Sequence, residues 1–171
     1  MEVGTSSVLM LPYAASSVGV ARRRLVGDLI EAGVYEATAC DAGLVLSELI
    51  SNALRHATPL PGAAVRVAWR VDDDSIEVAV SDGGGPTVPA ASDPGSSAIG
   101  GRGLGIVDRL SLRWGVFRDR GGTRETTVWA LLALQPDDAG NAQGGTEDST
   151  ASSADVAEPV PGLVTASIRD A

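Results

Sequence analysis

The sequence predicts an α+β fold: a two-layer sandwich in which a mixed, mostly antiparallel sheet is covered on one face by helices. Two observations lead to this prediction. The 171 residues are enough for one domain with a substantial core. Helical and alternating apolar patterns also occur in separate runs, in the order strand, two helices, two strands, a long loop, a helix and two strands. We expect the domain to comprise residues 9–135, after a flexible N-terminus at 1–8.

The first elements are a strand and two helices. The apolar run SSVLMLP ends at Pro12, which favours a strand at a sheet edge. The next segment has helical spacing, with a serine before it as the N-cap and Gly33 after it as the stop. A second helix is expected from about residue 36 to His56, where TPLPG ends it. Its apolar residues recur with helical periodicity at Leu46, Leu49, Ile50, Ala53, Leu54 and Ala57.

The remaining elements are strands, a long loop and one short helix. AVRVAWRV and IEVAVSD each alternate apolar and polar residues and are separated by DDDS, which predicts an antiparallel hairpin. Residues 83–103 show no periodicity, and a loop of that length inside a domain is usually functional. A helix GLGIVDRLS, a strand LRWGVFR, a turn DRGG and a strand TTVWALLAL complete the domain.

The C-terminal segment 136–171 is predicted to be a disordered acidic tail. It has no aromatic residue and is rich in Gly, Ser, Ala, Asp, Glu and Pro. Residues 1–135 hold 15 acids and 12 arginines, whereas the tail holds 7 acids and 1 arginine, so most of the net charge of −9 belongs to the tail. A chain with this balance lacks the positive potential that favours binding to nucleic acid or to an anionic membrane.

The composition excludes several classes of site. The chain has no lysine, and both the phosphate-binding P-loop and the eukaryotic-type protein kinase require one. One cysteine and one histidine cannot form a Cys/His zinc site. The early arginines follow a short apolar run rather than precede it, which is the wrong order for a secretory signal. No apolar run is long enough to span a membrane. We therefore expect a cytoplasmic protein.

Three short segments carry candidate functional residues. Glu48 and Asn52 stack one turn apart on the polar face of the second helix, which by itself also suits a solvated face. Asp82 ends an apolar strand and opens DGGGP, where glycines allow close approach of a ligand, although Asp-Gly also occurs in ordinary turns. The third segment, GGRGLGIV, runs into a helix N-terminus, which together with Arg102 favours an anion.

These segments together resemble the GHKL superfamily of ATP-binding domains, and within it the anti-sigma-factor serine/threonine kinases of bacteria. ELISNALRHA is similar to the N box, DGGGP and GGRGLGI to the two glycine boxes, and TTVW to the closing threonine box. The resemblance covers about residues 9–134 and implies the Bergerat ATP-binding fold. Residues 86–100 would form the mobile ATP lid.

The resemblance also implies a role for each matching residue. Glu48 would be the general base, Asn52 would coordinate Mg²⁺, and Asp82 would bind the adenine amino group. The candidate nucleotide contacts are Asn52, Arg55, Asp82, Gly84, Gly101, Arg102, Gly103, Leu104, Gly105, Thr126 and Thr127. Thr126 and Thr127 represent two possible registers of the closing box. His56 is interpreted as a structural or nucleotide-edge residue.

The function implied by the resemblance is that of a protein serine/threonine kinase that uses ATP and Mg²⁺. Its partners would be an antagonist protein that it phosphorylates, a sigma factor that it sequesters, or both, and it could form a homodimer. The alternative is a nucleotide-gated binding module without kinase activity, since Pro86 replaces the last glycine of the first glycine box. A third possibility is a catalytic fragment that acts on a histidine of a separate protein.

Overall fold

A computed structural model describes residues 5–86, 102–119 and 124–134. The elements in chain order are β1 (Ser6–Pro12), α1 (Ser16–Glu31), α2 (Glu36–His56), β2 (Ala64–Val71), β3 (Ser75–Asp82), α3 (Arg102–Leu110), β4 (Arg113–Arg118) and β5 (Thr126–Ala133). This is the predicted order of strands and helices. The segments 87–100 of the predicted lid, 120–122 of the predicted turn and 136–171 of the tail lie outside the described residues.

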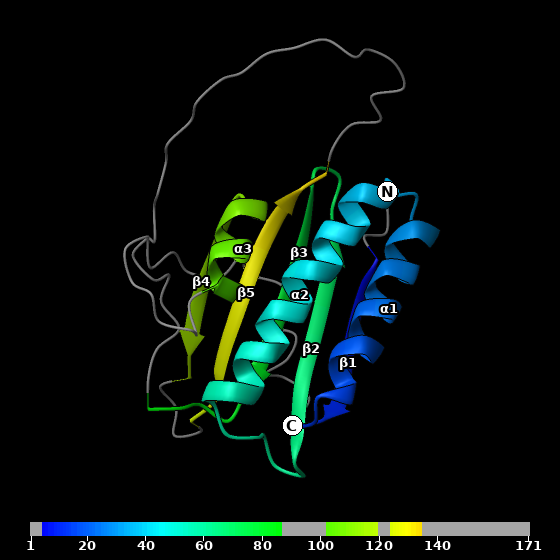
Figure 1. Cartoon of the computed structure of the whole chain (residues 1–171). Helices are drawn as coiled ribbons and strands as arrows, with labels where there is room; N and C mark the ends of the chain where they lie inside the picture. The colour runs from blue at the N-terminus through cyan, green and yellow to red at the C-terminus, as the bar shows by residue number, and fades with distance from the viewer. Residues whose placement is uncertain (1–4, 87–101, 120–123, 135–171) are drawn as a thin grey trace.

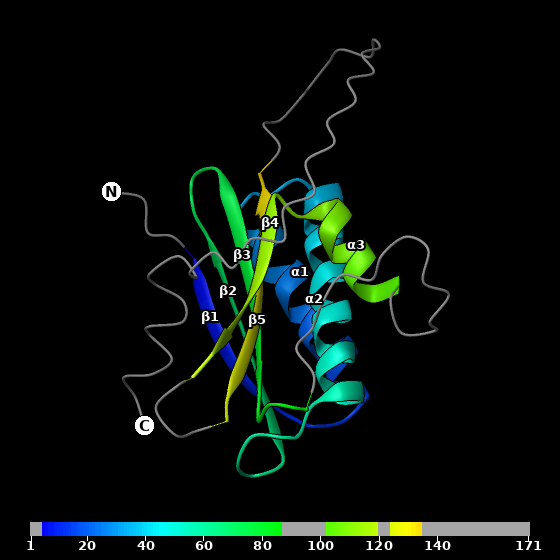
Figure 2. The same ribbon diagram turned by 90° about the vertical axis from the view of Figure 1, so that its left-hand side faces the viewer.

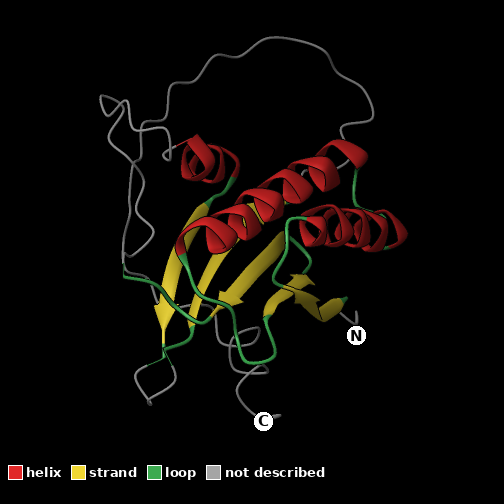
Figure 3. Cartoon of the chain, turned by 60° about the horizontal axis from the view of Figure 1, so that its bottom comes forward, coloured by secondary structure: helices red, strands yellow, loops and turns green. Residues whose placement is uncertain are grey.

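The strands form one five-stranded sheet in the order β1-β2-β3-β5-β4 (Figure 1). Each pair of neighbouring strands in this sheet is antiparallel. The prediction of a mixed sheet is therefore wrong for the described strands, which form a purely antiparallel one. β1 lies at the edge, as its proline-terminated sequence indicates. The three described helices lie on one face of the sheet (Figure 2), and Figure 3 shows α1 and α2 side by side above it. The predicted two-layer α+β fold is confirmed.

The main core lies between the helices and the sheet. Alternate residues of the strands point toward the helices, and they are buried against the apolar stripes of α1 and α2. Leu25 and Leu29 come from α1, and Leu46, Leu49 and Ile50 come from α2. The strands contribute Val65, Val67, Trp69, Ile76, Val78, Val80, Val128, Ala130 and Leu132. The same alternation fixes which side chains at the ends of β3 and β5 face the helices.

Two predicted boundaries differ from the structure. β1 spans Ser6–Pro12, which is the strand predicted from SSVLMLP, so it overlaps the expected flexible N-terminus at residues 6–8. The predicted serine N-cap of α1 is wrong, because Ala15 occupies that position. Ser17 lies inside the helix, and its Oγ donates a hydrogen bond to the carbonyl of Pro12 at 2.6 Å. The predicted stop is confirmed: Gly33, with φ of +83°, follows α1 directly after its C-cap, Ala32.

Candidate functional site

The candidate site lies where the end of β3, the start of β5 and the C-terminal half of α2 meet. Asp82 and Thr126 are directly opposite each other in the β3–β5 pairing. Both are buried, and by the alternation of the strands both face the helix layer together with Val80 and Val128. A carboxylate and a hydroxyl are thus placed side by side under α2.

A glycine turn follows Asp82 and is held by the loop after α2. The Gly84 N–H donates to Asp82 Oδ1 at 2.7 Å. The Thr58 N–H and hydroxyl both donate to the Gly84 carbonyl at 2.9 Å, and the Gly83 N–H donates to the Thr58 carbonyl at 2.8 Å. Gly84 has φ of +80°, and a side chain there would collide with the carbonyl of Arg124. The turn therefore requires glycine both for its dihedral angles and for its space.

The pKa of Asp82 is raised from 3.8 to about 6. Burial is the main cause, because it disfavours the ionised form, and the charge of Glu125 adds to it. The hydrogen bond from Gly84 and the charge of Arg118 act in the opposite direction. The carboxylate is therefore ionised at neutral pH but poorly solvated, which suits it to accept a hydrogen bond from a ligand that enters the site.

The polar face of α2 carries the two residues of the predicted N box. Asn52 is only 9% exposed, and its Nδ2 is buried without a hydrogen-bond partner. A buried NH₂ group without an acceptor is costly, by about 1 to 3 kcal/mol, and indicates a position where a ligand oxygen could accept a hydrogen bond. Glu48 lies one turn earlier and is partly exposed. The two side chains therefore lie on one face of α2, as their spacing predicts.

Asn52 also carries a side-chain oxygen of the kind that a magnesium ion accepts as a ligand. Among residues 5–86, 102–119 and 124–134 no group of three or more His, Cys, Asp or Glu side chains is placed to hold a metal. Mg²⁺ commonly takes only one or two protein ligands and completes its shell with water and substrate phosphates. A single asparagine oxygen fits this kind of ion, whereas it would not fit zinc.

Tyr13 belongs to the same region and was missed by the sequence analysis. Its hydroxyl oxygen lies 2.5 Å from the carbonyl of Ala53 and 2.6 Å from that of Ala57, so it caps the end of α2. Burial, and next the charge of Asp82, raise its pKa. The only signal in the sequence is its position directly after Pro12, where the edge strand ends. Tyr13 thus joins β1 to the helix end beside Asp82.

The second glycine segment leads into α3. Gly101 lies outside the described residues, and α3 begins at Arg102 and includes Gly103. Leu104 is buried in the main core, and Gly105 has open space where a side chain would stand. The predicted transition from a glycine-rich segment into a helix is confirmed, and Leu104 anchors that helix.

Comparison with known proteins identifies the fold and the family. A family model described as the histidine kinase-like ATPase domain matches residues 11–130. The chain belongs to this family. Among solved structures, the RsbU and RsbW domains of Rv1364c from Mycobacterium tuberculosis have a similar fold, with a TM-score of 0.58 and 18% sequence identity. That match covers 77% of this chain and 33% of the other, so the chain spans about a third of its length. None of the curated proteins compared with the chain matches it.

Not every predicted site residue of this histidine kinase-like ATPase domain faces the site. Thr127 points to the opposite face of the sheet from Asp82, and its Oγ1 lies 2.7 Å from Ser81 Oγ. Arg55 is exposed, and its Nε donates to the Ser51 carbonyl at 3.0 Å. His56 is exposed as well, while its carbonyl packs against Gly85. Of the two threonines, Thr126 is therefore the one that lies beside Asp82.

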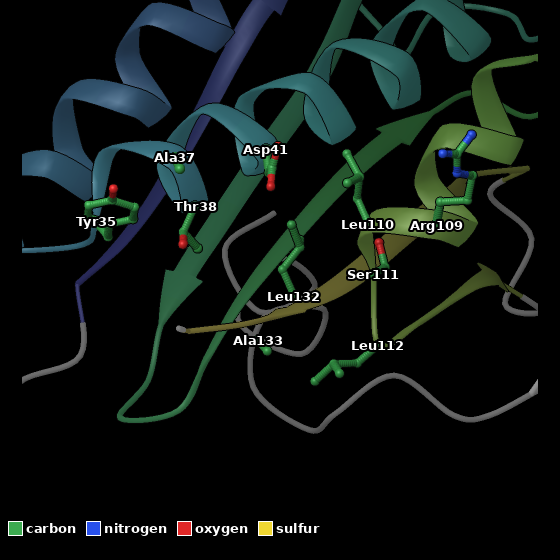
Figure 4. A pocket seen from close by; sticks show the side chains of 10 residues that line it. All are labelled: Tyr35, Ala37, Thr38, Asp41, Arg109, Leu110, Ser111, Leu112, Leu132 and Ala133. Carbon is green, nitrogen blue, oxygen red and sulfur yellow. The ribbon is translucent and has the colours of Figure 1, made fainter. Parts of the chain in front are cut away.

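A pocket of about 410 Å³ lies at the other end of α2, away from the candidate site (Figure 4). It is lined by residues of the α2 N-terminus, the C-terminal end of α3 with the segment after it, and the end of β5, among them Thr38, Asp41, Arg109, Ser111 and Leu132. None of the predicted nucleotide contacts lines it.

Among the described residues, no helix is long and apolar enough to cross a membrane.

Proposed function

We propose that this histidine kinase-like ATPase domain binds Mg²⁺-ATP between α2 and the β3–β5 end of the sheet and acts as an anti-sigma-factor-type serine/threonine kinase. Two observations carry the proposal: Asp82 lies opposite Thr126 where the glycine turn meets the end of α2, and the buried NH₂ group of Asn52, in the C-terminal half of α2, has no acceptor. Family membership supports nucleotide binding.

Each residue has a chemical task in this proposal. Asp82 accepts a hydrogen bond from the adenine amino group, and Thr126 contacts the same edge of the base. Asn52 supplies the oxygen for Mg²⁺, which neutralises phosphate charge when bound. Backbone N–H groups of the glycine segment that opens α3 bind the phosphates, with Arg102 as a fixed cation. Glu48 removes the proton from the attacking hydroxyl. The groups for the metal and for the proton are thus one helical turn apart.

The partners follow from the same proposal. The chain would phosphorylate a serine or threonine of an antagonist protein, bind a sigma factor, or do both, in the cytoplasm and as a homodimer. Support comes from the fold that this chain shares with the solved structure of the RsbU and RsbW domains. The nucleotide-gated binding module is the second candidate, and the specific observation in its favour is Pro86, which stands at the entrance to the predicted lid.

Glu48→Gln separates the two candidates. Glutamine keeps the shape of the side chain but cannot take a proton, so we expect unchanged Mg²⁺-ATP affinity and a loss of phosphate transfer of about 10²- to 10⁴-fold. Titration calorimetry measures the first quantity, and transfer of labelled phosphate to any antagonist protein found to be encoded beside this chain measures the second. If the wild-type chain binds Mg²⁺-ATP and its partner but transfers no phosphate, the binding module is correct. If the wild type does not bind Mg²⁺-ATP, both candidates fail.

Nucleotide affinity should depend on pH through Asp82. The ionised carboxylate accepts the hydrogen bond from adenine, and its pKa is about 6. We therefore expect constant affinity above that pH and a fall approaching about tenfold for each pH unit below it. Calorimetry from pH 5 to 8 measures the profile. The matched control is Asp82→Asn, which should bind more weakly and should not show the fall in affinity below about pH 6. If the wild-type profile has the same shape as that of the control, Asp82 is not the group whose ionisation controls ATP affinity.

A further inference from the structure

The backbone of Tyr13 is held at a corner of the sheet. Its N–H donates to the carbonyl of Ala63 at 2.8 Å, directly beside the last residue pair of β1 and β2, Pro12 and Ala64. Ala63 has φ of +54°, a conformation that a residue other than glycine keeps only where its surroundings hold it. The side chain of Tyr13 therefore extends from a fixed point.

The side chain of Tyr13 reaches the last turn of α2. Its hydroxyl donates to the carbonyl oxygens of Ala53 at 2.5 Å and Ala57 at 2.6 Å. The Ala53 carbonyl also accepts from the Ala57 N–H, whereas Ala57 is the C-cap, for whose carbonyl the helix supplies no donor. Burial, and next the charge of Asp82, raise the pKa of Tyr13, so the hydroxyl keeps its proton and remains a donor at neutral pH.

One of the two carbonyl contacts lies beside Asn52. Asn52 directly precedes Ala53 in α2, and it carries the side-chain oxygen that we propose as the ligand of Mg²⁺. A hydrogen bond to the Ala53 carbonyl thus holds the helix backbone next to the phosphate half of the proposed nucleotide site.

The other carbonyl contact lies beside the glycine turn that follows Asp82. Ala57 directly precedes Thr58, whose N–H, hydroxyl and carbonyl all form hydrogen bonds with that turn. The two backbones also approach closely on both sides of Ala57, because a side chain on Gly83 or on Gly85 would collide with a backbone carbonyl of the segment 56–59. The Tyr13 hydroxyl therefore holds the middle of the segment against which the turn is packed.

We propose that Tyr13 is a positioning residue of the nucleotide site, whose hydroxyl fixes the glycine turn after Asp82 relative to Asn52. The inference rests on the proposed function, because it concerns the same Mg²⁺-ATP site. Without the hydroxyl, the last turn of α2 is no longer tied to the corner of the sheet, and the base half and the phosphate half of the site lose their fixed relation. ATP spans both halves and binds only to molecules in which they are aligned, whereas adenosine needs the base half alone.

Tyr13→Phe tests the proposal on the full chain. Phenylalanine keeps the ring, which packs against the main core, and removes only the hydroxyl. The matched control is Tyr35→Phe, the same substitution at the other of the two tyrosines, which is 60% exposed at the N-cap of the same helix. We expect the affinity for Mg²⁺-ATP, measured by calorimetry, to fall about 3- to 10-fold in Tyr13→Phe, the size of one hydrogen bond. The affinity for adenosine, measured by NMR titration, should change less than about twofold. Tyr35→Phe should change neither.

A second control separates positioning from stability. Ile76→Val shortens a fully buried core side chain at the opposite end of β3 from Asp82. It should cost an amount of stability similar to the loss of one hydrogen bond. Because it leaves the end of α2 untouched, it should leave the affinities for Mg²⁺-ATP and adenosine unchanged.

Four results would overturn the proposal. If Tyr13→Phe binds Mg²⁺-ATP as tightly as Tyr35→Phe does, the hydroxyl does not position the site, and the proposed function stands without it. If Ile76→Val loses as much affinity as Tyr13→Phe, the effect is one of general stability. If the affinities for Mg²⁺-ATP and adenosine fall equally in Tyr13→Phe, the hydroxyl acts on the base half alone. If the wild type binds neither ligand, the nucleotide site itself is wrong, and the role of Tyr13 fails with it.

Discussion

Asp82→Asn should weaken ATP binding by about 10- to 150-fold and at the same time stabilise the ligand-free protein at neutral pH. Binding weakens because a carboxylate that accepts from adenine is replaced by a neutral amide, and removal of a buried charged hydrogen-bond acceptor costs about 1.5 to 3 kcal/mol. Asparagine can still accept the hydrogen bond from the Gly84 N–H through its Oδ1, so the turn should persist.

The gain in stability follows from the direction of the pKa shift. The pKa of Asp82 rises from 3.8 to about 6, so the fold disfavours the ionised form. The resulting cost is absent below the unfolded pKa and is fully present above about pH 6. At 1.36 kcal/mol per pKa unit it amounts to at most about 3 kcal/mol. The variant should therefore gain stability at pH 7.5 and gain little at pH 3.5.

Urea denaturation at these two pH values measures the effect, and Asp73→Asn is the matched control. Asp73 is exposed in the turn between β2 and β3, so its substitution should leave the free energy of unfolding nearly unchanged at both pH values. A gain for Asp82→Asn of equal size at pH 3.5 and 7.5 would show that desolvation of the carboxylate is not its cause. A loss of stability at pH 7.5 would contradict the prediction.

Asp82 and Asn52 share one physical property: each is a buried polar group that the described residues satisfy only in part. Such groups lower the stability of the ligand-free domain and are characteristic of sites that a ligand completes. The raised pKa at Asp82 and the unpartnered amide at Asn52 are thus two independent observations that point to the same end of the sheet.

Much of the fold could be predicted because it depends on local periodicity. The bounds of α2 agree with the sequence pattern, and so do the alternating faces of β2 and β3. The glycines of DGGGP were predicted to allow close approach of a ligand, but at Gly84 the space that a side chain would need is filled by the backbone carbonyl of Arg124, which the sequence could not show.

Other features depend on pairing between distant segments, which periodicity does not contain. The choice between Thr126 and Thr127 needs the β3–β5 register, because a shift of one residue exchanges the two faces. Tyr13 reaches Ala53 across 40 positions of sequence.

Gly84→Ala should be the most destabilising single-methyl substitution in the site. A residue other than glycine is strained at φ of +80°, and the added Cβ would also collide with the Arg124 carbonyl and approach Thr126 Oγ1 to 3.4 Å. Because the collision involves backbone, it can be relieved only by moving the segment before β5 away from β3. We expect a loss of about 4 kcal/mol or more in the free energy of unfolding, the size associated with strain and overpacking together.

Gly62→Ala is the matched control, because Gly62 has φ of +78° and nothing within 4 Å of its would-be Cβ. It isolates the dihedral strain and should cost only about 1 to 2 kcal/mol. Urea denaturation of both variants gives the difference, which measures the contact between the glycine turn and β5. Equal losses in the two variants would show that this contact is loose. In that case Asp82 and Thr126 would not be held together by the turn, and the geometry from which the nucleotide site is inferred would have to be revised.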